Sequence, residues 1–315
     1  MPLRRVRLYK PSIPPIFISG RPSPGTHFLD TTPARCSHYQ ARLGESPVYD
    51  PACDTLYWVD IPAKRIVRRD LGTGGESYVE APDLVTSVQL TGRQGEVVCT
   101  LRHSFCRADL AKGRFDVLAE VEKDVASNRF NDGKCDPSGR YWAGTMNVDL
   151  VSPTASLYVL DLDGEVRTRV SGLAVSNGLA WSRDAGRMYF IDTPTLKVFS
   201  FDYEEETGEV RNRAVCVDFR EEAGRPDGMT IDSEGMLWIA HARGGRVSRW
   251  DPARGKKLDE RALPFKATTS LAFGGRGLDR LYVTTSSELL KEAGAGHLYS
   301  LDPGVRGLPP DRVKI

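Results

Sequence analysis

The chain has 315 residues, of which 40% are hydrophobic and 27% are charged, as in a globular protein with a large buried core. Its 43 basic and 42 acidic residues nearly cancel, so the charge balance favours neither nucleic acid nor a membrane surface as a partner. No apolar stretch reaches the roughly 18 residues that a membrane-spanning helix needs. These properties indicate no particular oligomeric state.

The first 36 residues differ in composition from the rest. They are rich in Pro, Arg, Ser and Thr, and Asp30 is their one acidic residue. Pro11, Pro14 and Pro15 interrupt the apolar run that a signal peptide would need, and they disfavour the amphipathic helix of a transit peptide. We therefore predict a disordered tail over residues 1–36 and a cytoplasmic protein, with a transit peptide as the alternative.

The six cysteines lie at positions 36, 53, 99, 106, 135 and 216, and none belongs to a C-x-x-C pair. This spacing predicts no structural zinc site. Because no signal peptide precedes them, we interpret all six as reduced residues of a cytoplasmic protein, with Cys135 a small core residue.

A pattern of two strands recurs along the chain: an apolar-aromatic strand, a turn, and a second strand that ends near Asp and a turn residue. The copies, in chain order, are LYWVDIPAKRIVRRDLGTG from Leu56, the degenerate VVCTLRHSFCRADLAKG from Val97, RYWAGTM…SLYVLDLDG from Arg140, RMYFIDTPTLKVFSFDYEEETG from Arg187, LWIAHARGGRVSRWDPARG from Leu237 and LYVTTSSELL…GHLYSLDPG from Leu281. Six copies at intervals of about 40–50 residues match one four-stranded blade each. The sequence thus predicts an all-β, six-bladed β-propeller over residues 37–315. A β-sandwich array is the alternative, which the even spacing disfavours.

A second sequence motif, in which Asn or Asp precedes Gly, comes before several of these strands. It reads FNDGKCDPSGRYWAG from Phe130, SNGLAWSRDAGRMYF from Ser176 and PDGMTIDSEGMLWIA from Pro226. The innermost strand of a propeller blade begins near the central channel, so these polar residues are expected to line the channel mouth.

Three oxygen-bearing residues, Glu45, Asn177 and Asp227, are expected to converge there from separate blades. Two carboxylates and an amide form a site for one divalent cation such as Ca²⁺, Mg²⁺ or Mn²⁺, and Zn²⁺ is also compatible. The alternative is that Asn-Gly and Asp-Gly are merely turns. Ser176 lacks the G-x-S-x-G context of a serine hydrolase.

These motifs, with LGESPVYD from Leu43 and ATTSLAFGG from Ala267, resemble the senescence marker protein/regucalcin/gluconolactonase family over about residues 43–303. The resemblance implies a six-bladed propeller with one divalent metal in its channel, acting on sugar lactones. It implies Glu45, Asn177 and Asp227 as metal ligands, with Asp227 also the catalytic carboxylate.

The same resemblance implies Arg129 and Asn131 as substrate-binding residues. Asp149 stands near the position where the family often has a substrate-contacting Glu, so we include it as a third. The strand that usually precedes GESP and closes the ring has a poor counterpart here, because residues 26–40 contain Pro33.

We therefore expect a metal-dependent lactonase that opens a small lactone, such as gluconolactone, to the hydroxy acid. Two alternatives share the same site: a calcium-binding regulatory protein without turnover, and a hydrolase of organophosphates or other esters. A propeller used purely as an interaction platform would not require a channel carboxylate cluster.

Overall fold

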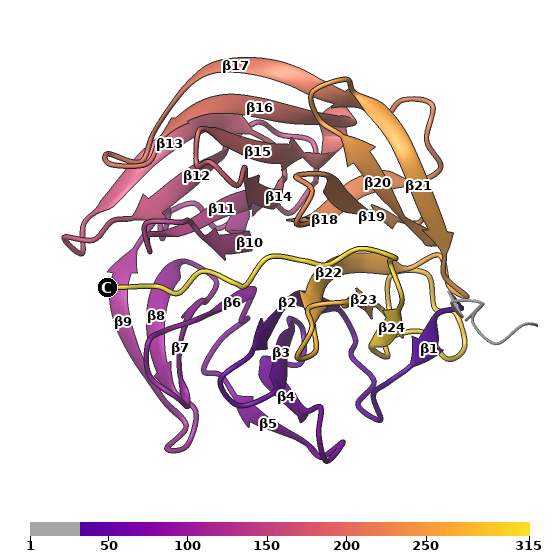
Figure 1. Cartoon of the computed structure of the whole chain (residues 1–315). Helices are drawn as coiled ribbons and strands as arrows, with labels where there is room; N and C mark the ends of the chain where they lie inside the picture. The colour runs from indigo at the N-terminus through magenta and orange to yellow at the C-terminus, as the bar shows by residue number, and fades with distance from the viewer. Residues whose placement is uncertain (1–31) are drawn as a thin grey trace, which may run out of the picture. The chain divides into compact units, whose positions relative to one another are not determined.

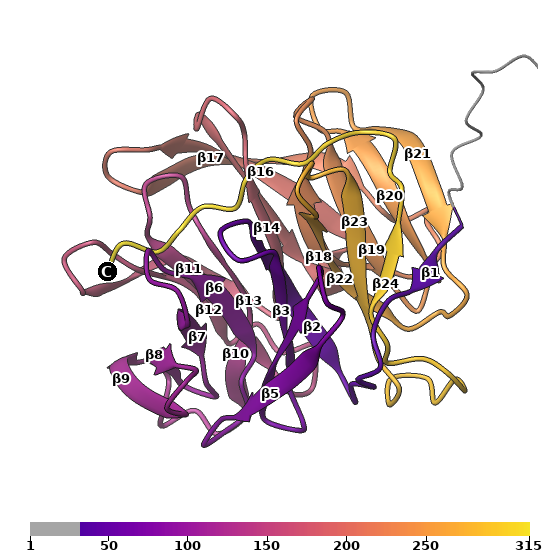
Figure 2. The ribbon, with the colours of Figure 1, turned by 60° about the horizontal axis from the view of Figure 1, so that its bottom comes forward.

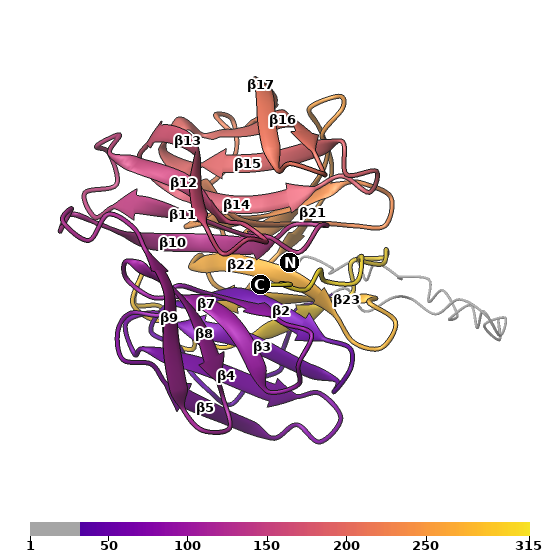
Figure 3. The same cartoon turned by 90° about the vertical axis from the view of Figure 1, so that its left-hand side faces the viewer.

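The computed structural model describes residues 32–315, which form a ring of six four-stranded antiparallel sheets (Figure 1). The six-bladed β-propeller is confirmed. In the first five sheets the first strand lies nearest the centre, as the order from β2 (Gly44–Asp50) to β5 (Glu76–Glu80) shows in Figure 3, and in the sixth sheet β22 (Thr268–Gly274) has this place. Among the described residues, no helix is long and apolar enough to cross a membrane.

The strands of the first three blades are β2 (Gly44–Asp50), β3 (Thr55–Asp60), β4 (Arg65–Asp70) and β5 (Glu76–Glu80); β6 (Ser87–Leu90), β7 (Glu96–Thr100), β8 (Ser104–Asp109) and β9 (Arg114–Glu120); and β10 (Asn128–Cys135), β11 (Tyr141–Asn147), β12 (Ala155–Leu160) and β13 (Val166–Leu173). Those of the fourth and fifth blades are β14 (Ser176–Trp181), β15 (Arg187–Asp192), β16 (Lys197–Glu204) and β17 (Glu209–Asp218), with the short 3₁₀ turn η1 (Thr193–Thr195), and β18 (Arg225–Ile231), β19 (Leu237–Ala242), β20 (Arg246–Asp251) and β21 (Lys256–Ala262). The sixth blade combines β22 (Thr268–Gly274), β23 (Arg280–Thr285) and β24 (Tyr299–Leu301) with β1 (Ala34–Arg35).

The hydrophobic core lies between the blades. Six apolar clusters each join residues of two neighbouring blades. The aromatic residues that mark the sequence repeat fall one to a cluster, at Tyr57, Tyr141, Tyr189, Trp238 and Tyr282. The repeated aromatic residue is therefore one with which a blade packs against its neighbour. A blade removed from the ring would expose this apolar residue to water.

The ring is closed by β1, which pairs with β24 as the outermost strand of the sixth blade (Figure 2). The pairs are Ala34 with Ser300 and Arg35 with Tyr299, and the Cys36 N–H donates to the Leu298 carbonyl at 2.9 Å. Residues 32–36 of the predicted tail therefore include the closing strand, and Pro33 lies directly before it. The rest of the predicted disordered tail lies outside the described residues.

This closure predicts different stabilities for two shortened proteins. A protein beginning at residue 37 should melt several degrees below one beginning at residue 32, because it loses the β1–β24 hydrogen bonds, each contributing about 1 kcal/mol. Thermal unfolding followed by circular dichroism compares the two. Equal melting temperatures would contradict the assignment of β1 as the closing strand.

A second closure is provided by residues 306–315, which we call the C-terminal strap. It crosses the central opening on the face seen in Figure 1. The strap bonds to five of the six blades, through Ser233 N–Arg306 O (2.8 Å), Gly307 N–Leu278 O (2.7 Å), Arg312 Nη2–Asp50 Oδ1 (2.5 Å), Val313 N–Leu90 O (2.8 Å) and Lys314 N–Gly139 O (2.9 Å). Beneath it lies a cavity of about 260 Å³, lined by all six blades and by strap residues 308–311.

Candidate metal and substrate site

The predicted site residues lie on innermost strands that bulge at the same place. The strand registers shift between Glu45 and Val48, between Asn177 and Leu179, and between Pro226 and Met229. A β-bulge bends its strand and re-aims the side chain at that position, which here belongs to a polar residue. Strands β10 and β22 bulge likewise, whereas the register of β6 is regular.

The glycines that follow the site residues allow the inner strands to approach each other closely. A Cβ on Gly178 would lie 2.6 Å from the Asp227 carbonyl oxygen, and one on Gly228 would lie 2.6 Å from the Ser270 Cα. Neither glycine has a positive φ. The Asn-Gly and Asp-Gly pairs therefore sit inside β14 and β18 and form no turns, so the alternative that they are turns is wrong.

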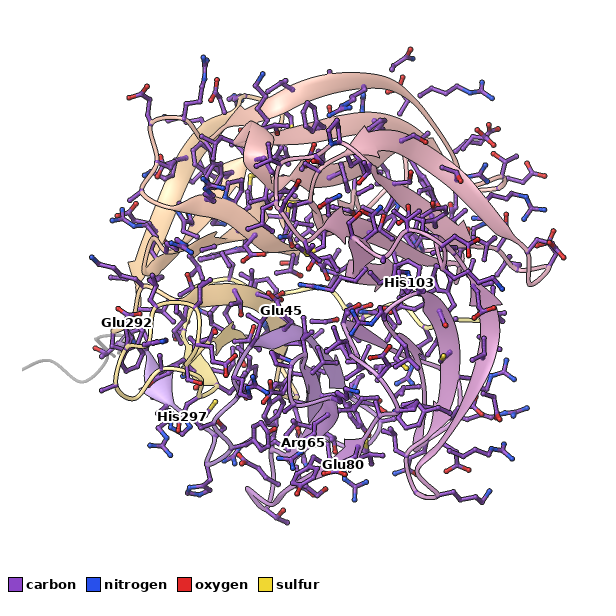
Figure 4. The ribbon with its side chains drawn as sticks, turned by 180° about the vertical axis from the view of Figure 1, so that it is seen from behind. Glu45, Arg65, Glu80, His103, Glu292 and His297 are labelled. Carbon is purple, nitrogen blue, oxygen red and sulfur yellow. The ribbon has the colours of Figure 1, made fainter. Side chains whose placement is uncertain are left out.

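The structure brings Asn177 and Asp227 into direct contact. The Asn177 Nδ2 donates to Asp227 Oδ1 at 2.5 Å and to Thr193 Oγ1 at 3.1 Å. Both side chains are buried, with 5% of Asn177 and 9% of Asp227 exposed. Glu45 comes from the first blade, and viewed from the face opposite to Figure 1 it lies at the centre of the ring (Figure 4).

Burial and mutual repulsion govern the electrostatics of this cluster. Burial raises the pKa of Asp227 to about 8, while the Asn177 hydrogen bond opposes the rise and Asp132 adds to it. Burial raises the pKa of Glu45 well above its usual range, and the neighbouring Asp227 and Asp132 raise it further. Within residues 32–315, no Lys or Arg forms an ion pair with any of these three carboxylates.

The donor set fits a divalent cation. The buried Asp227 and the partly buried Glu45 have no ion-pair partners among the described residues, and beside the Asn177 amide they form an oxygen-rich position whose charge a cation would compensate. No cluster of three His, Cys, Asp or Glu side chains in the described part of the chain could hold an ion without such an amide. The residues that would hold it are Glu45, Asn177 and Asp227, the set that the sequence predicts.

Arg129 lies at the start of β10 and keeps donors free. Its Nη1 donates to the Phe130 carbonyl at 2.8 Å and to Asn131 Oδ1 at 3.2 Å, while its Nε and Nη2 have no hydrogen-bond partner among the described residues. Burial lowers the pKa of Arg129 to about 10, and Glu45 opposes this shift. Asn131 in turn donates to the Ser176 carbonyl at 2.9 Å, so it fixes Arg129 beside the strand that carries Asn177.

The structure does not join Asp149 to this cluster. Asp149 is solvent-exposed, and its carboxylate accepts hydrogen bonds from Val151 N (2.8 Å), Ser152 N (2.8 Å) and Ser152 Oγ (2.5 Å) of its own turn. The Ser152 hydroxyl chiefly holds the pKa of Asp149 below its usual range. Its role in binding substrate stays a prediction.

Two residues near the site were not assigned from the sequence. Asp132 follows Asn131 and is 7% exposed, and its carboxylate accepts a hydrogen bond from the Gly133 N–H at 2.8 Å. Thr193 accepts the Asn177 amide and donates to the Pro226 carbonyl at 2.9 Å. Asp132 lies inside the NRFNDG phrase, which could have suggested it, whereas no sequence signal distinguishes Thr193.

Comparison with known families shows which family this chain resembles. The family described as "SMP-30/Gluconolactonase/LRE-like region" matches residues 43–287, which is most of the chain. This chain belongs to the SMP-30/gluconolactonase family. The predicted resemblance is confirmed, and the matched range includes every site residue discussed above.

Relatives of the SMP-30/gluconolactonase family support the same placement. Human regucalcin is 40% identical over 281 residues, which cover 85% of this chain and 94% of regucalcin. A solved luciferin-regenerating enzyme superposes with a TM-score of 0.85 at 33% identity, covering 90% of this chain and 99% of that enzyme. A calcium-binding protein, regucalcin, from Agrobacterium tumefaciens superposes with a TM-score of 0.84 at 26% identity, covering 89% and 97%.

Proposed function

We propose that this protein is a metal-dependent lactonase, which opens a small lactone such as gluconolactone to its hydroxy acid. One observation carries the proposal. The buried Asp227 and the partly buried Glu45 lie near the Nε and Nη2 donors of Arg129, which have no hydrogen-bond partner among the described residues. A purely calcium-binding protein would need the carboxylates, but it would have no use for a guanidinium fixed beside them.

The chemistry follows from these groups. When bound, the cation would polarise the lactone carbonyl and offset the negative charge that develops on its oxygen. Arg129 would orient the substrate through its free N–H groups, with Asn131 holding the guanidinium in place. Asp227 would take the proton from the attacking water at its carboxylate. The cytoplasm is the compartment we propose, because all six cysteines are unpaired.

A panel of lactones tests the proposal directly. The protein is stripped with chelator, verified metal-free by elemental analysis, and assayed for acid release with Ca²⁺, Zn²⁺, Mn²⁺ or Mg²⁺ added back. We expect hydrolysis of gluconolactone or a related lactone only after metal is restored. Calcium binding without acid release would favour the regulatory alternative, while faster hydrolysis of a phosphotriester or an aryl ester would favour the esterase alternative. Full activity of metal-free protein would contradict the metal mechanism.

Replacing Arg129 with alanine should separate substrate binding from metal binding. We expect kcat/KM to fall about 10- to 100-fold, the scale of a lost hydrogen bond to a charged group, while calcium affinity measured by calorimetry changes little. An Arg129→Ala protein that no longer binds calcium would show that the two roles are not separate.

The affinity of the site for a metal ion should rise with pH. In the metal-free protein the pKa of both Glu45 and Asp227 is raised, mainly by burial, so protons must leave before a cation binds. Calcium affinity should therefore rise between pH 6 and pH 8, by up to about tenfold per unit for each proton released. Calorimetry at several pH values measures this slope. Asp227→Asn removes one of the two acids and should flatten it, whereas a flat wild-type slope would contradict the ligand assignment.

A further inference from the structure

Lys134 makes a contact across the channel that the site described above does not use. It lies on β10, the inner strand of the third blade, and its Nζ donates to the Met229 carbonyl of β18 at 2.5 Å. Strand β14 of the fourth blade lies between β10 and β18 in the ring. The side chain therefore reaches past the inner strand of the fourth blade to the inner strand of the fifth.

The carbonyl that Lys134 holds belongs to the bulge that carries Asp227. The register of β18 shifts between Pro226 and Met229, which are the two ends of this bulge. At one end the Thr193 hydroxyl donates to the Pro226 carbonyl at 2.9 Å, and at the other the Lys134 ammonium donates to the Met229 carbonyl. The backbone on both sides of Asp227 is thus fixed by side chains from other blades.

The influence of Lys134 on Asp227 passes through the backbone. Lys134 is not among the charges that shift the pKa of Asp227 and Glu45, although it opposes the rise in the pKa of the nearby Asp132. In the part of the chain that the structure describes, the Lys134 ammonium forms no ion pair, and it donates its hydrogen bond to the Met229 carbonyl. Lys134 also lines the cavity beneath the C-terminal strap.

Stability alone does not account for a lysine at this position. Burial lowers the pKa of Lys134, which means that its surroundings disfavour the charged form. A methionine would fill the same space without that penalty, and apolar residues of similar volume often replace buried charges without loss of stability. The hydrogen bond from the Lys134 ammonium to the Met229 carbonyl is therefore the feature that a methionine could not replace.

We propose that Lys134 is a positioning residue, which holds the Pro226–Met229 bulge so that Asp227 keeps the geometry needed for metal and water. This inference rests on the proposed function for its catalytic part, whereas its metal-binding part stands without it. The chemistry is indirect, because Lys134 would touch neither the cation nor the lactone. Groups that orient a metal ligand in this way typically change metal affinity or activity by 10- to 100-fold when they are lost.

Three variants test this role. Lys134→Met removes the donor at nearly equal volume, Lys134→Arg keeps a cationic donor, and Asp311→Asn alters another charged residue that lines the same cavity. For each variant we would measure calcium affinity by calorimetry, kcat and KM on the best lactone, and the melting temperature. Calorimetry needs no substrate, so it decides the inference even if the wild-type protein opens no lactone.

We expect Lys134→Met to weaken calcium binding and lower kcat by about 10- to 100-fold each, with KM little changed and the melting temperature equal to wild type or higher. Lys134→Arg should recover most of both losses, and Asp311→Asn should resemble wild type. Wild-type calcium affinity in a folded Lys134→Met protein would overturn the inference. So would a loss of affinity that Lys134→Arg does not recover, because that would indicate a role in packing alone.

Discussion

Replacing Asp227 with asparagine should lower kcat by roughly 10²–10⁴-fold, the usual scale for a positioned acid–base group. Asparagine keeps the shape and one oxygen ligand, but it cannot accept the proton of the attacking water. If Asp227 is both ligand and base, raising the metal concentration to saturation should recover little of the loss. Steady-state kinetics over a metal titration measures both effects.

Asn177→Ala is the matched comparison, because Asn177 touches Asp227 at 2.5 Å but is proposed only as a ligand. Its defect should shrink substantially as metal is added. Should saturating metal restore Asp227→Asn to nearly wild-type turnover, Asp227 would be a ligand only. The base would then be sought elsewhere, with the buried Asp132 and the exposed Asp149 as candidates.

Gly228→Ala should destabilise the protein by about 3 kcal/mol or more, at or above the usual range for overpacking a core. The added Cβ would lie 2.2 Å from the Ser270 Oγ and 2.6 Å from the Ser270 Cα, and the backbone at this point cannot move aside without separating the fifth and sixth blades. Urea unfolding measures the change. Gly92→Ala is the control, because a Cβ there would meet nothing within 4 Å, and its free energy of unfolding should change by no more than about 0.5 kcal/mol.

A Gly228→Ala protein as stable as wild type would show that the inner strands can separate at this point. The site could then not depend on their close approach for its geometry. Because Gly228 directly follows Asp227, the same variant should also weaken calcium binding, and this loss should persist at temperatures where the protein is fully folded.

The fold could be predicted from the sequence because one physical requirement is repeated six times. Each blade packs an aromatic or large apolar residue against its neighbour, so residues such as Tyr57 and Trp238 recur in the sequence at nearly even intervals. The ring closure could not be predicted in the same way. The two-residue strand β1 owes its place to pairing with β24, more than 260 residues away, and its own sequence around Pro33 carries no strand signal.

The candidate site was predictable in its residues but not in its supports. Asn177 and Asp227 stand in phrases that recur from blade to blade, and the structure places them in contact. Lys134 and Thr193 act through backbone carbonyls of another blade, and such contacts depend on the ring geometry. The bulges belong to the same class, because a register shift arises from the pairing of two strands and leaves no mark in either one alone.

The pairing of β1 with β24 also bears on how the protein is made. A ribosome delivers Ala34 and Arg35 early, but their partners Tyr299 and Ser300 are added only after the first five blades have been synthesised. Until then the first and fifth blades each expose an apolar face to solvent, and exposed apolar surface of this kind favours aggregation. The nascent chain therefore passes through a long stage in which the ring is open. We expect chaperones to bind it at this stage, and destabilising mutations to cause most aggregation then.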